Sequence, residues 1–212
     1  MRHGDHSMNS RPPLRKLFLL WAACLVFAIG GVAFAALLMN GNALRSAAVR
    51  HFGGPFSLVN QKGETVTQAA FKGKPTVIFF GYTNCQDICK TTLADMSRWQ
   101  SELGSQPSGI QFVFVTVDPA RDTPEVLRKY LQNFSGHFIA LSGSPKRVDA
   151  MLRAYHVVDQ HVAEAGGKYS IDHTASIFLI NSDGSLAGTI GPQDTPASGL
   201  AKLRRLLSRK SV

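Results

Sequence analysis

Short runs of mostly apolar residues alternate with longer segments of mixed polarity over most of this 212-residue chain. The run 76–80 has the apolar character of a strand buried on both faces, and the segment 88–103 has the length of a helix. Further strands are predicted at 110–117, 138–142, 176–180 and 185–190, and further helices at 123–133, 144–155 and 195–209. This order of elements predicts an α/β domain whose mixed sheet is covered by helices on both faces.

The segments that connect these elements predict two hairpins and one irregular region. Residues 56–60 and 65–67 are predicted to pair as a hairpin around the turn 61–64. Asn181 to Gly184 has the composition of a hairpin turn between the last two strands. The polar, glycine-containing segment 157–168 is predicted to be a loop or an excursion from the domain.

A segment of a different kind lies near the N-terminus, where residues 17–39 contain no charged side chain. A helix of that length spans the ~30 Å hydrocarbon core of a bilayer. Arg11, Arg15 and Lys16 precede it, so the positive-inside rule predicts a cytoplasmic N-terminus at 1–16. A cleaved signal peptide with Ala33-Phe34-Ala35 as its site is the alternative, but the apolar region of such a peptide is shorter.

An uncleaved anchor divides the chain into four parts. Residues 1–16 are the cytoplasmic end, 17–39 the transmembrane helix, 40–54 a linker and 55–212 the exported globular domain. No transit peptide rich in Arg and Ser is present, which favours a bacterial protein. The predicted location is therefore the inner membrane, with a single span and the C-terminal domain in the periplasm.

The net charge of +9 is concentrated at the two ends of the chain. Residues 1–16 carry +3 and residues 201–212 carry +5, which leaves +1 for the body between them. A nearly neutral body has no continuous basic face for phosphates. We therefore expect no nucleic-acid partner.

Cys85 and Cys89 are the most informative side chains, because they lie at the turn between the strand at 76–80 and the following helix. A helix N-terminus stabilises thiolates, and a spacing of four residues places both sulfurs on one side of a helical turn. His173, just before a predicted strand, can bring an imidazole to the same place. Two thiolates and one imidazole suit copper better than a hard cation. On spacing alone, a dithiol redox couple and a structural disulfide stay open.

Three segments of the chain, taken together, resemble the signature motifs of one family. Residues Gly81 to Cys89, Val117 to Pro124 and Tyr169 to Thr174 resemble, in order and spacing, the motifs of the Sco/SenC family. The resemblance covers about residues 55–207 and implies a thioredoxin-like fold, with a mixed sheet, flanking helices and one preceding transmembrane helix. Members of that family are membrane-tethered copper proteins that help to assemble the binuclear copper centre of cytochrome c oxidase.

The resemblance implies that Cys85, Cys89 and His173 are the metal ligands, with Cu(I), Cu(II) or both as the metal. It also implies a function: delivery of copper to the copper-site subunit of the oxidase, or maintenance of that subunit's thiols, with a thioredoxin-like reductant as a further partner. The family often has proline where this chain has Gln86 and Lys90. The charge of Lys90 is expected to lower the pKa of Cys89 and make it the more acidic thiol.

An enzyme is the alternative to a carrier. A thiol:disulfide oxidoreductase or a thiol peroxidase of the thioredoxin-like class uses the same kind of cysteine turn. A peroxidase is disfavoured, because Thr83 is one position too close to Cys85 for a Thr-x-x-Cys arrangement. The sequence therefore favours a metallochaperone over an enzyme.

Other chemically active side chains have smaller expected roles. Asp118, Arg121 and Asp122 are expected to form an ion-paired turn beside the site. Asp172 either orients His173 or only ends a strand. His161, together with Asp159 and Glu164, could form an auxiliary or entry site for the metal.

Overall fold

The computed structural model describes residues 30–31, 52–104 and 109–209. The chain divides into two compact units, Met1–Arg50 and His51–Val212. Apart from the helical Gly30 and Gly31, the predicted anchor at 17–39 lies outside the described residues. Among the helices that are described, none has both the length and the apolar character needed to cross a membrane.

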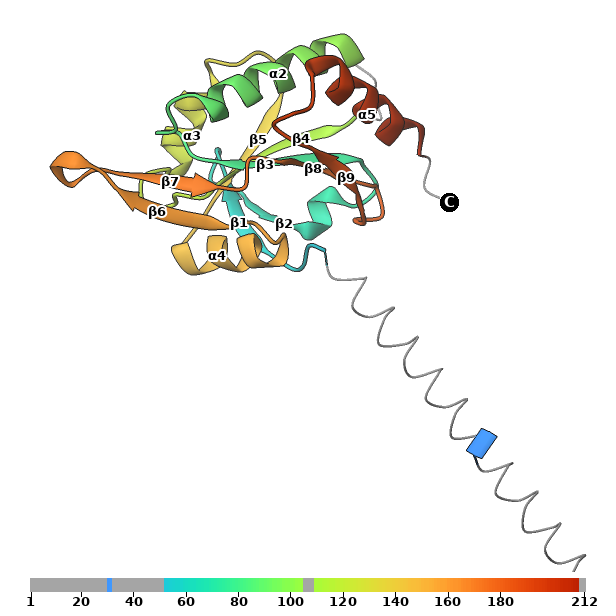
Figure 1. The fold of residues 1–212 in the computed structure, drawn as a ribbon, viewed down its shortest axis with the longest axis horizontal. Helices are drawn as coiled ribbons and strands as arrows, with labels where there is room; N and C mark the ends of the chain where they lie inside the picture. The colour runs from blue at the N-terminus through green and yellow to red at the C-terminus, as the bar shows by residue number, and fades with distance from the viewer. Residues whose placement is uncertain (1–29, 32–51, 105–108, 210–212) are drawn as a thin grey trace, which may run out of the picture. The chain divides into compact units, whose positions relative to one another are not determined.

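The second unit is built on a seven-stranded sheet (Figure 1). Its strands are β1 (Ser57–Asn60), β2 (Thr65–Thr67), β3 (Thr76–Gly81), β4 (Gln111–Thr116), β5 (Phe138–Ser142), β8 (Ile177–Ile180) and β9 (Leu186–Ile190). They lie side by side in the order β2-β1-β5-β4-β3-β8-β9. The central strands β3, β4 and β5 are parallel, and the outer pairings are antiparallel. The predictions of a mixed sheet and of a hairpin at β1 and β2 are confirmed.

Side chains of β3 fill the core on both faces of the sheet, and every residue of the strand is buried. The ring of Phe79 packs 6.0 Å from that of Phe114 on β4, whereas Phe80 packs 5.7 Å from Tyr155. Successive side chains of a strand point to opposite faces, so these two contacts belong to two different layers. The continuous apolar run at 76–80 is the consequence of this double burial.

In the described part of the second unit, four α-helices flank the sheet, namely α2 (Ile88–Leu103), α3 (Pro124–Leu131), α4 (Pro145–Ala154) and α5 (Pro196–Ser208). Figure 1 shows α2 and α5 together on one side of the sheet and α4 on the other. The Trp99 indole donates to the Pro196 carbonyl (2.9 Å) and joins α2 to α5. Thr123 and Thr195 cap α3 and α5 with their hydroxyls, each followed by a proline in the first turn.

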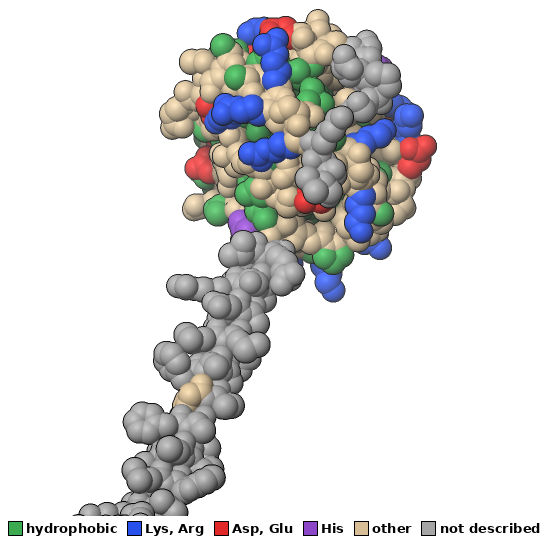
Figure 2. Space-filling model, turned by 90° about the vertical axis from the view of Figure 1, so that its right-hand side faces the viewer, with side chains coloured by type: hydrophobic (Ala, Val, Ile, Leu, Met, Phe, Trp, Pro, Cys, Tyr) green, Lys and Arg blue, Asp and Glu red, His purple; other side chains and the backbone are tan. Residues whose placement is uncertain are grey.

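Basic side chains in α5 and at its C-terminal end bind to β9 and to the loop between β9 and α5. Lys202 donates to the Asp194 carboxylate (2.7 Å) and to the Thr189 carbonyl (3.0 Å), and Arg209 donates to the Ala187 carbonyl (3.3 Å). Figure 2 shows the side of the domain that is on the right in Figure 1, and its Lys and Arg side chains are scattered among uncharged atoms. The face shown carries no single continuous basic patch among the described residues.

The segment 157–168, predicted to be a loop or an excursion, is an excursion that forms one half of a β-hairpin. Strands β6 (Asp159–Ala163) and β7 (Tyr169–His173) pair with each other as a separate two-stranded sheet, joined through a short 3₁₀ turn, η2 (Ala165–Gly167). Figure 1 shows this hairpin extending from the body of the domain. The strand within this segment was not predicted, because all five β6 side chains are exposed and show no apolar alternation. A 3₁₀ turn, η1 (Gln68–Phe71), is a second element that the sequence pattern did not indicate.

Candidate metal centre

The cysteine turn begins where β3 ends at Gly81 and finishes where α2 begins at Ile88. The Cys85 amide donates to the Tyr82 carbonyl (3.3 Å), which closes the turn before the helix starts. Cys89 is the second residue of α2, so only one of the two cysteines is helical. The expectation of two sulfurs on one helical turn was wrong. The irregular turn, rather than helical periodicity, brings them together.

His173 is the last residue of β7 and lies beside the cysteines. Its Nε2 atom is 3.5 Å from Cys89 Sγ, and its Nδ1 atom is 3.1 Å from the Thr174 carbonyl oxygen. A carbonyl oxygen only accepts, so Nδ1 donates to Thr174 and Nε2 faces the sulfurs. The side chain of Asp172 is exposed and, by strand alternation, on the opposite face of β7. The orienting group is therefore the Thr174 carbonyl and not Asp172.

The sulfurs of Cys85 and Cys89 and one ring nitrogen of His173 all lie within 4.8 Å of one another. In the part of the chain that the structure describes, this is the only group of three or more His, Cys, Asp or Glu side chains that is close enough to hold one ion. Both cysteines are free thiols. Two soft sulfurs and a neutral imidazole fit a soft or borderline metal such as Cu(I), Cu(II) or Zn²⁺, and do not fit Mg²⁺ or Ca²⁺.

The auxiliary metal group expected from Asp159, His161 and Glu164 does not form. These side chains do not approach closely enough to share an ion in the described residues. The His161 ring instead stacks on Tyr169, with ring centroids 4.9 Å apart and planes inclined by 21°. His161 therefore belongs to the packing of the hairpin.

The two thiols differ strongly in acidity. A hydrogen bond from the Cys89 thiol lowers the pKa of Cys85 to about 4, whereas that same bond and burial raise the pKa of Cys89. Cys89 is fully buried, and Cys85 is 7% exposed. The expectation that Lys90 makes Cys89 the more acidic thiol was wrong, because the lysine is exposed to solvent and the buried sulfur is desolvated. Cys85 is the thiolate.

Gly81 provides the space that the buried sulfur occupies. A Cβ atom at this position would lie 2.9 Å from Cys89 Sγ and 2.9 Å from the ring of Phe114. Both distances are shorter than a van der Waals contact. Any larger residue would displace the sulfur or the aromatic core beneath it.

Asp122 anchors the cysteine turn to the sheet. Its carboxylate accepts from the Thr83 amide (3.0 Å), the Thr83 hydroxyl (2.6 Å) and the Thr116 hydroxyl (2.6 Å). Thr83 lies in the turn and Thr116 at the end of β4. Burial raises the pKa of the Asp122 carboxyl, although these three hydrogen bonds oppose the shift.

The predicted ion-paired turn is confirmed, and it also holds the hairpin. Arg121 forms a salt bridge with Asp118, and its guanidinium lies 3.7 Å from the centroid of the Tyr169 ring on β7. The Tyr169 hydroxyl donates to Asp118 (2.9 Å), and Arg121 donates to the Tyr169 carbonyl (3.0 Å). The motif at 117–124 therefore connects the strand of His173 to the core.

The sequence analysis assigned no role to Gly81, Tyr82 or Thr174, because their roles depend on contacts between distant segments. All three lie within the signature motifs, and this was the only sign of their importance. No periodic pattern distinguishes them.

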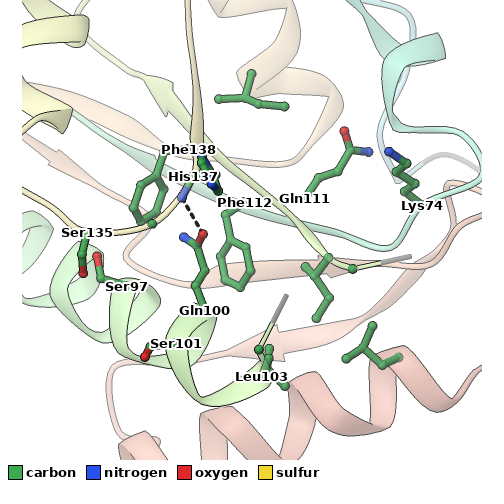
Figure 3. Close-up of a pocket in the computed structure, with 16 residues that line it drawn as sticks. Lys74, Ser97, Gln100, Ser101, Leu103, Gln111, Phe112, Ser135, His137 and Phe138 are labelled. Carbon is green, nitrogen blue, oxygen red and sulfur yellow. Dashed lines mark hydrogen bonds between the residues drawn. The ribbon is translucent and has the colours of Figure 1, made fainter. Parts of the chain in front are cut away.

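A separate hollow of 740 Å³ is drawn in close-up in Figure 3. It is lined by the end of α2, the start of β4 and the segment before β5, where the His137 amide donates to the Gln100 side chain (2.7 Å). Cys85, Cys89 and His173 are not among its lining residues. The cysteine turn follows the carboxyl end of β3, where parallel α/β sheets place their sites, whereas this hollow adjoins the starts of β4 and β5.

Comparisons with known proteins agree with the motifs. The SCO1/SenC family model matches residues 45–208. The solved structure of Bradyrhizobium japonicum ScoI with copper bound is 39% identical, with a TM-score of 0.68 over 73% of this chain and 99% of that one. Protein SCO2 of Saccharomyces cerevisiae mitochondria is 35% identical over 72% of this chain and 52% of its own length. A putative copper-binding protein of Stutzerimonas stutzeri is 37% identical over 63% of this chain and 66% of its own length.

These similarities confirm the resemblance found in the three motifs and the thioredoxin-like fold that it implied. This chain spans about half of the yeast relative and about two thirds of the bacterial one. The match to the family model covers most of the chain, including the whole cysteine turn, the ion-paired turn and the hairpin. The chain therefore belongs to the SCO1/SenC family.

Proposed function

We propose that this protein binds one copper ion through Cys85, Cys89 and His173 and carries it to the copper-site subunit of cytochrome c oxidase. The observation that carries the proposal is the convergence of two sulfurs and one imidazole nitrogen within 4.8 Å. The same donors also accept Zn²⁺, and the preference for copper is supported by the family and by the copper-bound ScoI structure.

Copper is the cargo here, and it leaves by exchange of ligands. Cys85 is the more exposed sulfur, and His173 lies on a hairpin outside the main sheet. A thiolate of the partner joins the ion from the exposed side, and His173 is the ligand released, because the nitrogen is the weakest donor to Cu(I) in the set. Cys89 is the more deeply buried sulfur and is the last ligand to release the copper.

A second function is favoured by the asymmetry of the thiols. The lowered pKa and greater exposure of Cys85 are those of an attacking cysteine. The Cys85 thiolate would attack a partner disulfide and form a mixed disulfide, releasing one partner thiolate. Cys89 would then attack Cys85 and release the second partner thiol, which leaves a Cys85–Cys89 disulfide. A thioredoxin-like reductant must reopen that bond before the next cycle.

Cys85→Ser and Cys89→Ser separate the two functions. A carrier needs both sulfurs, so each variant should lose copper retention to a similar degree. In disulfide exchange, Cys85→Ser should abolish attack on a model disulfide, whereas Cys89→Ser should still form the mixed disulfide. Full copper retention by either variant, together with lost reductase activity, would overturn the carrier proposal in favour of the enzyme. Loading each variant in parallel with Zn²⁺ tests the choice of metal.

We also propose the topology predicted from the sequence, with residues 1–16 in the cytoplasm, an anchor at 17–39, a linker at 40–54 and an exported domain at 55–212. The support is the uncharged length of 17–39 and the basic residues before it. A reporter active only in the periplasm, fused after Ala48, should be active, and a reporter active only in the cytoplasm should be silent at the same position. The reverse result would overturn both the location and the oxidase partner.

A further inference from the structure

Tyr82 lies between the two halves of the metal centre and contacts both. Its carbonyl accepts from the Cys85 amide (3.3 Å), within the cysteine turn. Its hydroxyl accepts from the backbone N–H of Ile171 (3.1 Å), 89 positions further along the chain. The side chain is 4% exposed, so both contacts are shielded from water.

The second contact matters because the hairpin that carries His173 is not part of the main sheet. Among the described strands, β7 pairs with β6 and with no other strand. Strand pairing fixes His173 relative to β6. Its position relative to the cysteines is set by the short connection to β8, which begins at Ile177, and by side-chain contacts. The Ile171 N–H, two residues before His173, makes one of these contacts with Tyr82.

The ring of Tyr82 adds a direct contact with the imidazole. The rings of Tyr82 and His173 pack edge to face, with centroids 5.9 Å apart and planes inclined by 82°. The Phe79 ring packs against the same imidazole, with centroids 6.3 Å apart. Phe79 holds only the ring, whereas Tyr82 holds both the ring and the strand.

We propose that Tyr82 is a positioning residue whose hydroxyl holds β7 so that His173 Nε2 reaches the copper ion. This inference rests on the proposed function, since it concerns how the third ligand is brought to the metal. Tyr82 acts through His173 and does not touch the ion. Without the hydroxyl, the Ile171 N–H loses its buried acceptor, and β7 gains freedom to move away from the cysteines.

Tyr82→Phe tests the proposal because it keeps the ring and removes only the hydroxyl. The matched control is Tyr130→Phe, since the buried Tyr130 hydroxyl has no hydrogen-bond partner in the described part of the chain. In the metal-free protein, we expect faster hydrogen exchange at the Ile171 amide in Tyr82→Phe and no change there in Tyr130→Phe. After copper loading, Tyr82→Phe should lose copper to a competing chelator at about 10-fold lower chelator concentration than wild type.

The same change in a His173→Ala background separates positioning from a general loss of stability. If Tyr82 acts through His173, adding Tyr82→Phe to His173→Ala should cause no further loss of copper. An equal loss in both backgrounds, or wild-type retention in Tyr82→Phe, would overturn the inference. A wild-type chain that holds no copper would overturn the proposed function and this inference with it, whereas the Ile171 exchange rate would still report whether Tyr82 holds the strand.

Discussion

Cys89 Sγ lies 3.5 Å from His173 Nε2, although 84 positions separate the two residues in the sequence. The buried sulfur is fixed by α2, and the nitrogen is fixed by a hairpin that is joined to the core through the short connection to β8 and through side chains. The centre therefore has one rigid half and one half whose position depends on a few contacts.

The first prediction concerns the order of reaction of the thiols. Because the pKa of Cys85 is about 4 and that of Cys89 is raised, iodoacetamide should alkylate Cys85 first in the reduced, copper-free protein. Its rate should be nearly flat at neutral and mildly acidic pH and should fall only near pH 4, where the thiolate is protonated. Peptide mapping by mass spectrometry distinguishes the two sites. Equal labelling of both cysteines, or a Cys85 rate that still climbs about tenfold per pH unit near neutrality, would contradict this assignment.

The second prediction concerns Gly81. Gly81→Ala places a methyl group 2.9 Å from Cys89 Sγ, so the sulfur or the Phe114 ring must move. We expect the free energy of unfolding to fall by about 1–3 kcal/mol, with weaker copper retention. Gly191→Ala is the matched control, because the nearest atom to its Cβ would be 3.6 Å away. Denaturant unfolding of both variants measures the difference, and equal unfolding free energies would show that the sulfur has room to move.

The third prediction concerns the anchor of the cysteine turn. Asp122→Asn replaces a carboxylate that accepts three hydrogen bonds, and we expect a loss of about 1–3 kcal/mol in the free energy of unfolding. The folded-state pKa of Asp122 is raised above its ordinary value of 3.8. The contribution of Asp122 to stability is therefore fully present below pH 3.8 and is lost as the pH rises through the folded-state pKa. Asp122→Asn should cost more near pH 4 than near neutral pH.

Asp183→Asn is the control, because its cost in stability should depend on pH in the opposite direction. Hydrogen bonds from Ser185 lower the pKa of Asp183 below its ordinary value, so its contribution is present above that value and is lost in acid. The cost of Asp183→Asn should thus be greater at neutral pH than in acid. Unfolding curves across this pH range that show the same trend for both variants would refute the burial argument for Asp122.

The parts of the fold that were predictable are those with a repeating apolar pattern. The run at 76–80 predicted a strand buried on both faces, and the helices predicted from 123 and from 195 correspond to α3 and α5, which begin at Pro124 and Pro196. The strand β6 was not predictable in this way, because all of its side chains are exposed. Burial creates the pattern, so a strand without a buried face leaves none.

The motifs in the sequence identified the ligand residues, but they did not reveal the contacts that hold these residues in place. Cys85, Cys89 and His173 belong to chemically distinctive residue types inside recognisable segments. Tyr82 and Asp122 have ordinary side chains whose role appears only when residues 89 and 39 positions away come into contact. The acidity of the thiols was misjudged for the same reason, because the neighbouring charge of Lys90 is visible in the sequence whereas the burial of Cys89 is not.

Copper K-edge X-ray absorption on the reduced, Cu(I)-loaded chain identifies the atoms that bind the metal. We expect two sulfur ligands and one nitrogen ligand per copper in the wild type, through Cys85, Cys89 and His173. His173→Ala should keep both sulfurs and lose the nitrogen, whereas His137→Ala, in which the replaced histidine lies beside the separate hollow, should leave the spectrum unchanged. A nitrogen ligand that persists in His173→Ala, or a wild-type spectrum with fewer than two sulfurs, would contradict the assigned centre.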